Sequence, residues 1–297
     1  MSKIDLHIHS NFSDDGELTV EDIVNISKEN GMKYISITDH NSVKGVKRAV
    51  ECGNDVGVEV IPGIEIDCTY NSLNLHVLGY FIDYTRKEFD ELEKSIFEQE
   101  IKIASEKIEK LQKNTGLKID LSEVLERANG KIVTGELIGE ILLNKKDSIN
   151  NELLKPYLNN GARSDMPYVN FYWDFFSQGK AAYIPINYIS LREAINLIKS
   201  SNGVPIIAHP GNNLKNNMDI IDSIIKEGIE GIEVFSSYHS LEQTNYFNNK
   251  AFEHKVLVTC GSDFHGKNKP NIKIGGCNCD LDYNNIINPL KASINKL

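Results

Sequence analysis

Close to the N-terminus the chain reads Lys3-Ile4-Asp5-Leu6-His7-Ile8-His9. This segment predicts the first strand of the fold. Apolar and polar residues alternate along it, which is the pattern of a β-strand whose two faces meet different surroundings. His7 and His9 are two residues apart, so both imidazoles point to the same side while Ile8 packs on the other. The first expected strand therefore carries two potential metal ligands on one face.

Short runs rich in Ile and Val recur along the chain and alternate with helix-like segments. The further candidate strands are Tyr34–His40, Val58–Asp67, Leu75–Ile82, Ala181–Pro185, Val204–Pro210, Gly231–Ser236 and Val256–Asp263. Helices between them begin after N-cap residues such as Thr19 and Ser190 and end at glycines such as Gly31 and Gly203. Strands that alternate with helices are typically parallel, and about seven such units favour an α/β fold with a closed or nearly closed barrel.

The strand pattern stops between Arg86 and Lys180, where helical segments replace it. The expected helices are Glu91–Asn114, Leu121–Ala128 and Gly135–Leu143. We therefore expect a barrel built from residues 1–86 and 180–297, with a helical insertion over residues 87–179. Because loops at the carboxyl ends of barrel strands build the active site, an insertion there can cap it.

The composition excludes several classes of protein. The 297 residues include 42 acidic and 32 basic side chains, a formal charge of -10, which disfavours a duplex nucleic acid as partner. No run approaches the roughly 18 apolar residues of a membrane span, and histidines stand where a signal peptide needs its apolar run. Five cysteines without framework spacing indicate reduced thiols. We therefore expect a cytoplasmic protein.

Side chains of the kinds that bind metals gather at the ends of the expected strands. They are His7, His9, Asp14, His40, Glu65, His76, His209, Asp263 and His265. A single histidine at a strand end is more often a hydrogen-bonded structural residue than a ligand, and a buried glutamate can pair with an arginine. Nine such residues together are a different case, because each unpaired buried charge would cost several kcal/mol. Bound cations remove that cost, so the sequence predicts a site for several metal ions.

Four motifs, in this order, resemble those of the PHP (polymerase and histidinol phosphatase) family. They are His7-x-His9 with the turn Ser13-Asp14-Asp15-Gly16, Thr38-Asp39-His40 with Gly63-Ile64-Glu65, His209-Pro210, and Gly261-Ser262-Asp263-Phe264-His265. The resemblance implies a distorted (β/α)7 barrel with a trinuclear metal centre. The chain most resembles the branch that includes nucleoside 3',5'-bisphosphate phosphatases and 5'-to-3' exoribonucleases.

On matching positions, the resemblance implies three divalent ions with shared ligands. The first would take His7, His9, Glu65 and Asp263, the second would share Glu65 and add His76 and His209, and the third would take Asp14, His40 and His265. The turn reads Ser-Asp-Asp-Gly where many members have Ser-Asp-Gly, so the ligand is either Asp14 or Asp15, and the spacing from His9 favours Asp14. The absence of a thiolate favours Mn, Fe or Zn.

The insertion departs from this branch at Val133-Thr134-Gly135-Glu136, where members often carry Arg-Pro-His at a helix start. The nucleotide specificity of the branch is therefore not carried over. Arg163 is the expected replacement as a phosphate clamp, with a surface ion pair to an acid as an equal alternative. His239 follows a strand and would protonate the leaving oxygen if it faces the site. The aromatic run Tyr168–Phe176 is expected to pack in a core rather than to stack on bases.

The charges of the expected centre favour a phosphate ester. Three divalent ions contribute six positive charges and three carboxylates return three, so the centre is cationic and suits a phosphate dianion. A hydroxide bridging two metals would attack phosphorus while the third metal and Arg163 neutralise the equatorial oxygens. The sequence thus predicts a metal-dependent phosphoric monoester hydrolase acting on a small phosphorylated substrate, a nucleotide or a similar molecule.

Three other functions stay open at this point. One is a phosphodiesterase or 5'-3' exoribonuclease acting on short RNA, and another is an amidohydrolase-like hydrolase of C–N bonds. The third is a module in which the metals only hold the fold together. This last one is disfavoured, because structural metal sites are usually closed by protein ligands, whereas these ligands lie at loop-bearing strand ends.

Overall fold

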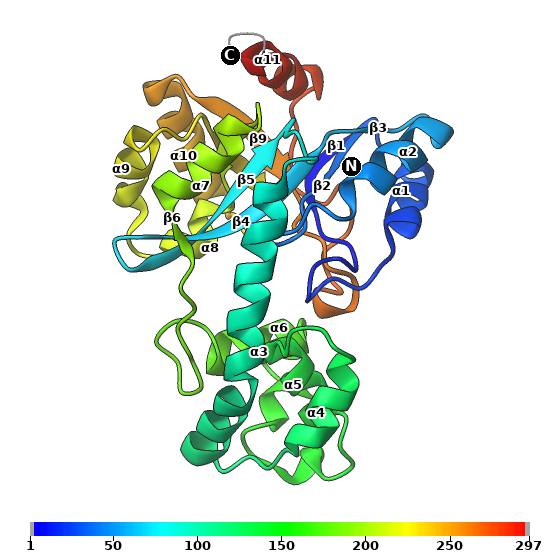
Figure 1. The fold of residues 1–297 in the computed structure, drawn as a ribbon, viewed down its shortest axis with the longest axis vertical. Helices are drawn as coiled ribbons and strands as arrows, with labels where there is room; N and C mark the ends of the chain where they lie inside the picture. Colours follow the sequence, from blue (N-terminus) through cyan, green and yellow to red (C-terminus); the bar gives the residue numbers. More distant parts are fainter. Residues whose placement is uncertain (1–2, 295–297) are drawn as a thin grey trace.

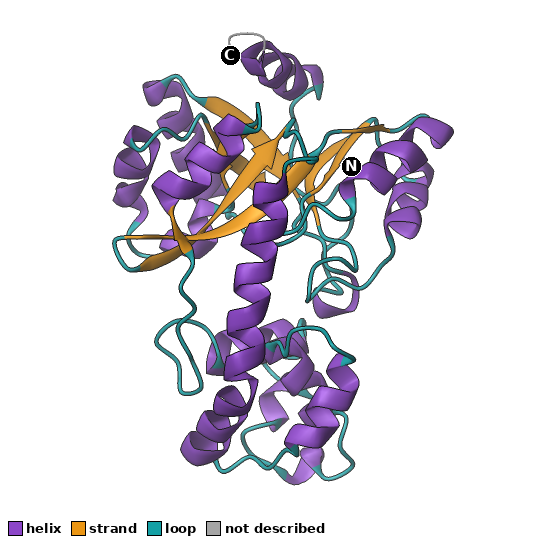
Figure 2. Ribbon diagram, in the orientation of Figure 1, coloured by secondary structure: helices purple, strands orange, loops and turns teal. Residues whose placement is uncertain are grey.

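The computed structural model describes residues 3–294, which form two lobes (Figure 1). The described strands lie in the upper lobe of this view with helices around them, and the lower lobe consists of helices and loops (Figure 2). The long helix α3 (Lys87–Thr115) runs from one lobe into the other.

The strands form two sheets joined by isolated bridges. The first sheet is parallel and has the order β1 (Ile4–Ile8), β2 (Tyr34–Ile37) and β3 (Glu59–Val60). The second has the order β6 (Ile189–Ser190), β4 (Gly63–Tyr70), β5 (Leu73–Tyr80), β7 (Val204–Ile207), β8 (Gly231–Ser236) and β9 (Leu257–Gly261). Parallel bridges between Ile8 and Phe264 and between His40 and Glu65 connect the sheets. Two candidate metal ligands thus form one of the two connections.

The expected α/β class is confirmed, whereas a closed barrel is not. The described strands form two sheets, and β5 runs antiparallel to both β4 and β7. The cause is local: Asn71 and Ser72 alone connect β4 to β5, and both have positive φ angles, 49° and 65°. A two-residue turn of this kind makes a hairpin and leaves no room for a crossover helix.

Two of the expected strands differ in the structure. Val58–Asp67 is split into β3 and β4, since Pro62 has no backbone N–H to give to a ladder. Ala181–Pro185 forms no strand. Ala182 instead packs in the core of the lower lobe, and its N–H donates to the carbonyl of Phe175.

Seven α-helices of the described residues accompany the sheets, and they are α1 (Val20–Glu29), α2 (Val46–Val56), α7 (Leu191–Ser200), α8 (Pro210–Leu214), α9 (Ile221–Lys226), α10 (Leu241–His254) and α11 (Asn284–Ile294). Of these, α1, α7 and α10 begin after capping side chains. The hydroxyl oxygens of Thr19 and Ser190 accept hydrogen bonds from first-turn N–H groups of α1 and α7. Gly31 follows α1 with a φ of 71°, as expected, but after α7 it is Asn202, with a φ of 61°, and not Gly203 that adopts the left-handed conformation.

The lower lobe has a hydrophobic core of its own, and α3 belongs to both cores. Its other helices are α4 (Leu121–Ala128), α5 (Gly135–Leu143) and α6 (Pro167–Phe175). Phe89 and Ile96 of α3 pack in the core of the sheets, while Ile108 and Leu111 pack in the core of the lower lobe. A helix fixed at both ends holds its middle turns in a set position between the lobes. The division into residues 1–86 with 180–297 and residues 87–179 remains our proposal.

Candidate metal centre and its cavity

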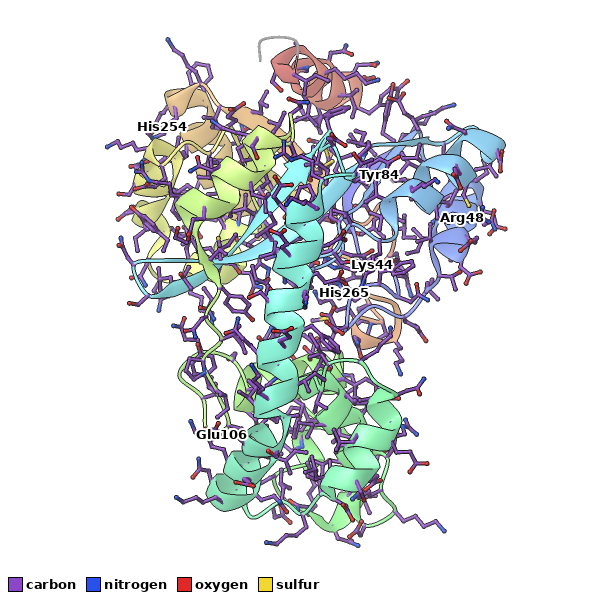
Figure 3. All side chains as sticks on the ribbon, in the orientation of Figure 1. Lys44, Arg48, Tyr84, Glu106, His254 and His265 are labelled. Carbon is purple, nitrogen blue, oxygen red and sulfur yellow. The ribbon has the colours of Figure 1, made fainter. Side chains whose placement is uncertain are left out.

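Three groups of histidines and carboxylates gather where strand ends meet. They are His9, Asp15, His40 and His265; His7, Glu65, His209 and Asp263; and His40, Asp67 and His76. Within each group the potential ligand atoms lie within 4.8 Å of one another. Figure 3 labels His265 below the sheets, at the level where the upper lobe meets the lower one. Of the nine expected ligands, all except Asp14 belong to these groups.

Glu65 lies at the centre of this arrangement. Its Oε2 is 3.1 Å from Nε2 of His7 and 3.1 Å from Nε2 of His9. Its Oε1 is 3.0 Å from Nδ1 of His76 and 3.1 Å from Nε2 of His209. Two ligands that each lie about 2.1 Å from one ion are themselves about 3.0 to 3.4 Å apart, depending on the coordination geometry. The spacing fits a carboxylate that bridges two cations.

Several buried polar atoms in these groups have no hydrogen-bond partner among the described residues. They are Oδ1 of Asp15, Nδ1 of His40, Oε2 of Glu65, Oδ1 of Asp67, Nδ1 of His209 and Nε2 of His265. Buried polar atoms normally have partners, and leaving one without a partner costs about 1–3 kcal/mol. Cations coordinate atoms of this kind, and each group holds its ligand atoms within 4.8 Å of one another, so the residues present fit a group of divalent ions.

Neighbouring acceptors indicate which ring nitrogen of each histidine is free. Nδ1 of His7 donates to Oε1 of Glu233 at 3.0 Å, and Nδ1 of His265 donates to the backbone carbonyl of Asp263 at 2.9 Å. In these assigned tautomers Nε2 carries no hydrogen and can serve as a ligand. The other oxygen of the buried Glu233 accepts from the backbone N–H of His209 at 2.7 Å. One carboxylate therefore orients two candidate ligands.

Two candidate ligands have strained backbone conformations. The φ angles of His209 and Asp263 are 23° and 57°, which residues other than glycine rarely adopt. Each lies two residues beyond the end of a strand, β7 and β9 respectively. The N–H of Asp263 donates to the carbonyl of His7 at 2.8 Å, which holds this conformation in place. Such strain is maintained mainly at functional sites.

The buried charges of the cluster depend on one another. Burial favours the neutral form of Glu65, but the imidazoles of His7 and its neighbours lower the pKa of the carboxyl well below its ordinary value. Burial also opposes the charging of His7, yet without a bound cation the Glu65 and Glu233 carboxylates raise its pKa well above the ordinary range, and a cation at Nε2 would take the place of that proton. For His9, burial and the adjacent imidazoles lower the pKa to about 4. His9 is therefore held in the neutral form that binds cations.

The choice of Asp14 over Asp15 does not match the structure. Oδ2 of Asp15 lies 3.2 Å from Nε2 of His265, whereas Asp14 belongs to none of the three groups. Asp14 is exposed, and its carboxyl hydrogen-bonds the backbone of Ile132 instead. Consecutive residues in a tight turn point in different directions, so spacing from His9 alone could not identify the ligand.

Asp67 is a member of the third group that the sequence reasoning missed. Its Oδ1 lies 3.3 Å from Nδ1 of His40 and 3.4 Å from Nε2 of His76. Asp67 stands two residues after Glu65 on β4, and residues at this spacing face the same side of a strand. The alternation that paired His7 with His9 would also have found it.

Arg163 and His239 are not placed at the cavity. Nε and Nη2 of Arg163 donate to the two oxygens of Asp174 at 2.9 and 3.0 Å, which is the alternative of an ion pair with an acid. Nδ1 of the buried His239 donates to the carbonyl of Val234 at 2.8 Å, and its Nε2 accepts from the N–H of Gly211 at 3.0 Å. With both ring nitrogens engaged, His239 has no free atom to protonate a leaving group.

A cavity of about 220 Å³ lies between the metal-ligand groups and the lower lobe. Its lining includes the buried Lys269, whose Nζ is 2.6 Å from Oδ2 of Asp263. The aromatic run of α6 is divided: Phe171 packs in the core of the lower lobe as expected, whereas Tyr172 and Trp173 line the cavity. Lys269 follows the last motif without a recognisable pattern, so no feature of the sequence indicated its role.

Residues 5–163 match the model of the PHP domain, which is more than half of the chain. This chain belongs to the PHP domain family. The resemblance stated from the four motifs is thereby confirmed. The family and the candidate metal groups support a metal-dependent hydrolase of phosphoesters, with the ester left open.

Three of the curated relatives of this PHP chain have different activities in their names. It is 26% identical over 267 residues, 89% of this chain and 94% of the relative, to a phosphoribosyl 1,2-cyclic phosphate 1,2-diphosphodiesterase from Eggerthella lenta. It is 25% identical over 279 residues, 93% and 91% of the two chains, to a 3',5'-nucleoside bisphosphate phosphatase from Chromobacterium violaceum. It is 26% identical over 269 residues, 89% and 90%, to a 5'-3' exoribonuclease from Haemophilus influenzae.

Solved structures share the fold of this PHP chain. A protein from Bifidobacterium adolescentis described as a metal-dependent phosphoesterase has a TM-score of 0.77 at 24% identity, covering 97% of this chain and 95% of that one. An amidohydrolase from Chromobacterium violaceum, with sulfate bound and no metal, has a TM-score of 0.75 at 24% identity, covering 92% of this chain and 91% of that one.

None of the helices in residues 3–294 combines the length and apolar character that a membrane span requires.

Proposed function

We propose that this PHP protein is a metal-dependent phosphoesterase that hydrolyses a small phosphomonoester, a nucleotide or a similar molecule. One observation supports it most: three groups of buried metal-ligand atoms, several without a partner among the described residues, lie beside a cavity that also contains a buried lysine. Cationic charge beside a cavity suits a phosphate group, and the cavity volume of about 220 Å³ suits a small molecule.

We propose three divalent ions, Mn, Fe or Zn, as cofactors. The first position takes His7, His9, Glu65 and Asp263; the second takes Glu65, His76 and His209; the third takes Asp15, His40 and His265. When bound, such ions supply Lewis-acid activation of water and of the phosphate. Asp67, which faces His40 and His76, is a further candidate ligand at the edge of the second and third positions.

Lys269 replaces Arg163 as the proposed ligand of the substrate phosphate. Its Nζ is held by Oδ2 of Asp263, and this same oxygen accepts a hydrogen bond from the hydroxyl of Tyr238 at 2.6 Å. Lys269 and Tyr238 both line the cavity, and neither belongs to a metal-ligand group. They are thus placed to bind phosphate oxygens that the proposed ions leave free, and to orient the ester for attack in line.

The principal alternative is a phosphodiester substrate, such as a cyclic phosphate or the end of a short RNA. Two of the relatives are named a diphosphodiesterase and an exoribonuclease, which keeps this alternative in place. A C–N bond is the weaker alternative, because the likeness to the amidohydrolase structure is one of fold.

Phosphate release from a panel of esters, with Mn²⁺ added, tests the proposal. The panel contains nucleoside 5'- and 3'-monophosphates, nucleoside 3',5'-bisphosphates, sugar phosphates, a cyclic phosphate and a short RNA, with Asp15→Ala as the control protein. We expect release from a monoester by the wild type and at least about a hundredfold less by the control. Cleavage of the diester or RNA alone would replace the monoester assignment with the alternative. No cleavage of any ester by protein with its metals bound would refute phosphoesterase function.

A further inference from the structure

The wall of the cavity that belongs to the lower lobe carries an acid where a substrate would extend away from the metal-ligand groups. Glu136 is the second residue of α5, is only 7% exposed and lines the cavity. Its carboxyl hydrogen-bonds the hydroxyl of Thr134 and its own backbone N–H. Burial, and then the nearby Asp15 charge, raise the pKa of Glu136 to about 8, and the charge of Lys269 offsets them only in part.

Two further charged residues of this wall neutralise each other. Glu100 and Lys107, from the middle turns of α3, both line the cavity and form an ion pair with each other. The ammonium group of Lys107 also donates to the carbonyl of Val133 at 3.1 Å, so its donors point into the wall. Glu136 therefore leaves this wall with a net acidic group.

Few fixed cations are available to a second phosphate. Within residues 3–294, the lining of the cavity contains no arginine, and its two lysines are Lys107 and Lys269. Lys107 is paired with Glu100, and Lys269 is paired with the candidate ligand Asp263, although its charge also acts on Glu136. A second phosphate at the Glu136 side would meet a carboxyl group without a neutralising partner.

The remaining lining of this side suits an uncharged organic group. Tyr172 and Trp173 of α6 line the cavity, and the ring of Trp173 lies 6.2 Å, centroid to centroid, from that of Tyr238. Aromatic faces pack against sugar and base rings, and a carboxyl accepts hydrogen bonds from hydroxyl or amino groups.

We propose that Glu136 selects substrates with a single phosphate and a hydroxyl- or amino-bearing organic part, and rejects those with a second phosphate. The inference rests on the proposed function and names the substrate class within it. Phosphate binds at Lys269 and the proposed ions, and the organic part extends toward Tyr172, Trp173 and Glu136. Above about pH 8, where the Glu136 carboxyl is ionised, it accepts hydrogen bonds from hydroxyl or amino groups and discriminates by charge against a dianion at the same place.

The test compares kcat/KM for adenosine monophosphate, as the better of its 3' and 5' isomers, with kcat/KM for adenosine 3',5'-bisphosphate, in the presence of Mn²⁺ and at about pH 9, where the Glu136 carboxyl is ionised. The proteins are the wild type, Glu136→Gln, Glu136→Lys and, as a matched control in the same lobe, Glu126→Lys, whose native side chain is exposed. We expect the wild type to prefer the monophosphate about tenfold or more, and the preference to fall about tenfold in Glu136→Lys and less in Glu136→Gln. Glu126→Lys should match the wild type.

A wild type that prefers the bisphosphate, or a preference that stays the same within about twofold at Glu136→Gln and Glu136→Lys, overturns the inference. The ratio does not depend on the fraction of folded protein, and if Glu136→Lys is inactive, Glu136→Gln, which keeps the size of the side chain, decides. Failure of the proposed function is distinguishable, because wild-type protein with metals bound would then release phosphate from neither ester. That outcome overturns the inference with it.

Discussion

Nζ of Lys269 lies 2.6 Å from Oδ2 of Asp263, while Oδ1 of the same carboxylate lies 3.2 Å from Nε2 of His9. One oxygen of Asp263 thus faces the candidate metal centre and the other faces a buried lysine. This relationship places a fixed cation directly behind a proposed metal ligand and at the edge of the cavity. It also accounts for a buried ammonium group, which needs a paired charge.

Replacing Lys269 with methionine should weaken substrate binding. The change keeps the length of the side chain and removes the charge, so a charge-assisted hydrogen bond to phosphate is lost. We expect KM for the preferred ester to rise about 10- to 100-fold. Steady-state kinetics with saturating Mn²⁺ measure this effect. Lys267→Met is the matched control, because Lys267 pairs with Glu140 outside the cavity and its loss should leave KM unchanged. An unchanged KM in Lys269→Met would remove Lys269 from the phosphate site.

The two aspartates of the turn can be separated by metal content. Asp15→Asn removes a charged ligand from the group with His40 and His265, so we expect about one metal ion fewer per chain. Asp14→Asn should retain the wild-type metal content, since Asp14 lies outside the three groups. Elemental analysis after gel filtration measures both. The reverse result, loss in Asp14→Asn alone, would restore the expectation drawn from spacing.

Glu233 should control metal affinity without being a ligand itself. Its two oxygens hold Nδ1 of His7 and the backbone N–H of His209. Glu233→Gln removes the charge and one acceptor, so either Nδ1 of His7 or the backbone N–H of His209 loses its partner, and we expect about 10- to 100-fold weaker metal binding. Competition with a chelator of known affinity measures the change. Glu230→Gln, at the start of β8 and paired with Lys199, serves as control, and equal affinities in the two variants would contradict this role.

Some residues of the site can be predicted from the sequence and others cannot. Strict alternation along a strand identified His7 with His9 on one face, because it depends only on the geometry of extended backbone. The same rule would have given Asp67 from Glu65. Asp15 could not be chosen over Asp14, because the direction of a side chain in a tight turn depends on φ and ψ angles that no spacing encodes.

Tertiary contacts decide the residues that the sequence misplaced. Arg163 pairs with Asp174, eleven positions further along in the same insertion, and a basic residue in a loop gives no sign of which acid it will meet. His239 follows a strand as the ligands do, but the carbonyl of Val234 and the N–H of Gly211 take both of its ring nitrogens. The expectation of a parallel barrel was wrong for a related reason. The turn at Asn71 and Ser72 makes β5 antiparallel to β4, which excludes a barrel of parallel strands only.

The pH dependence of stability provides a test of the Glu136 environment that needs no substrate. In metal-free protein, burial and then Asp15 raise the pKa of Glu136 to about 8 from an ordinary value of 4.5. The folded state then holds a proton that the unfolded state has released, so between pH 4.5 and 8 this group makes stability fall as pH rises. At pH 7 this lowers the free energy of unfolding by about 3 kcal/mol.

Glu136→Gln removes this cost, so the variant should be similar to the wild type near pH 5 and melt several degrees higher at pH 8. Thermal unfolding with a chelator present measures the difference. A constant offset between the two proteins from pH 5 to 8 would mean that the Glu136 carboxyl titrates normally and is not held in a buried, acidic wall.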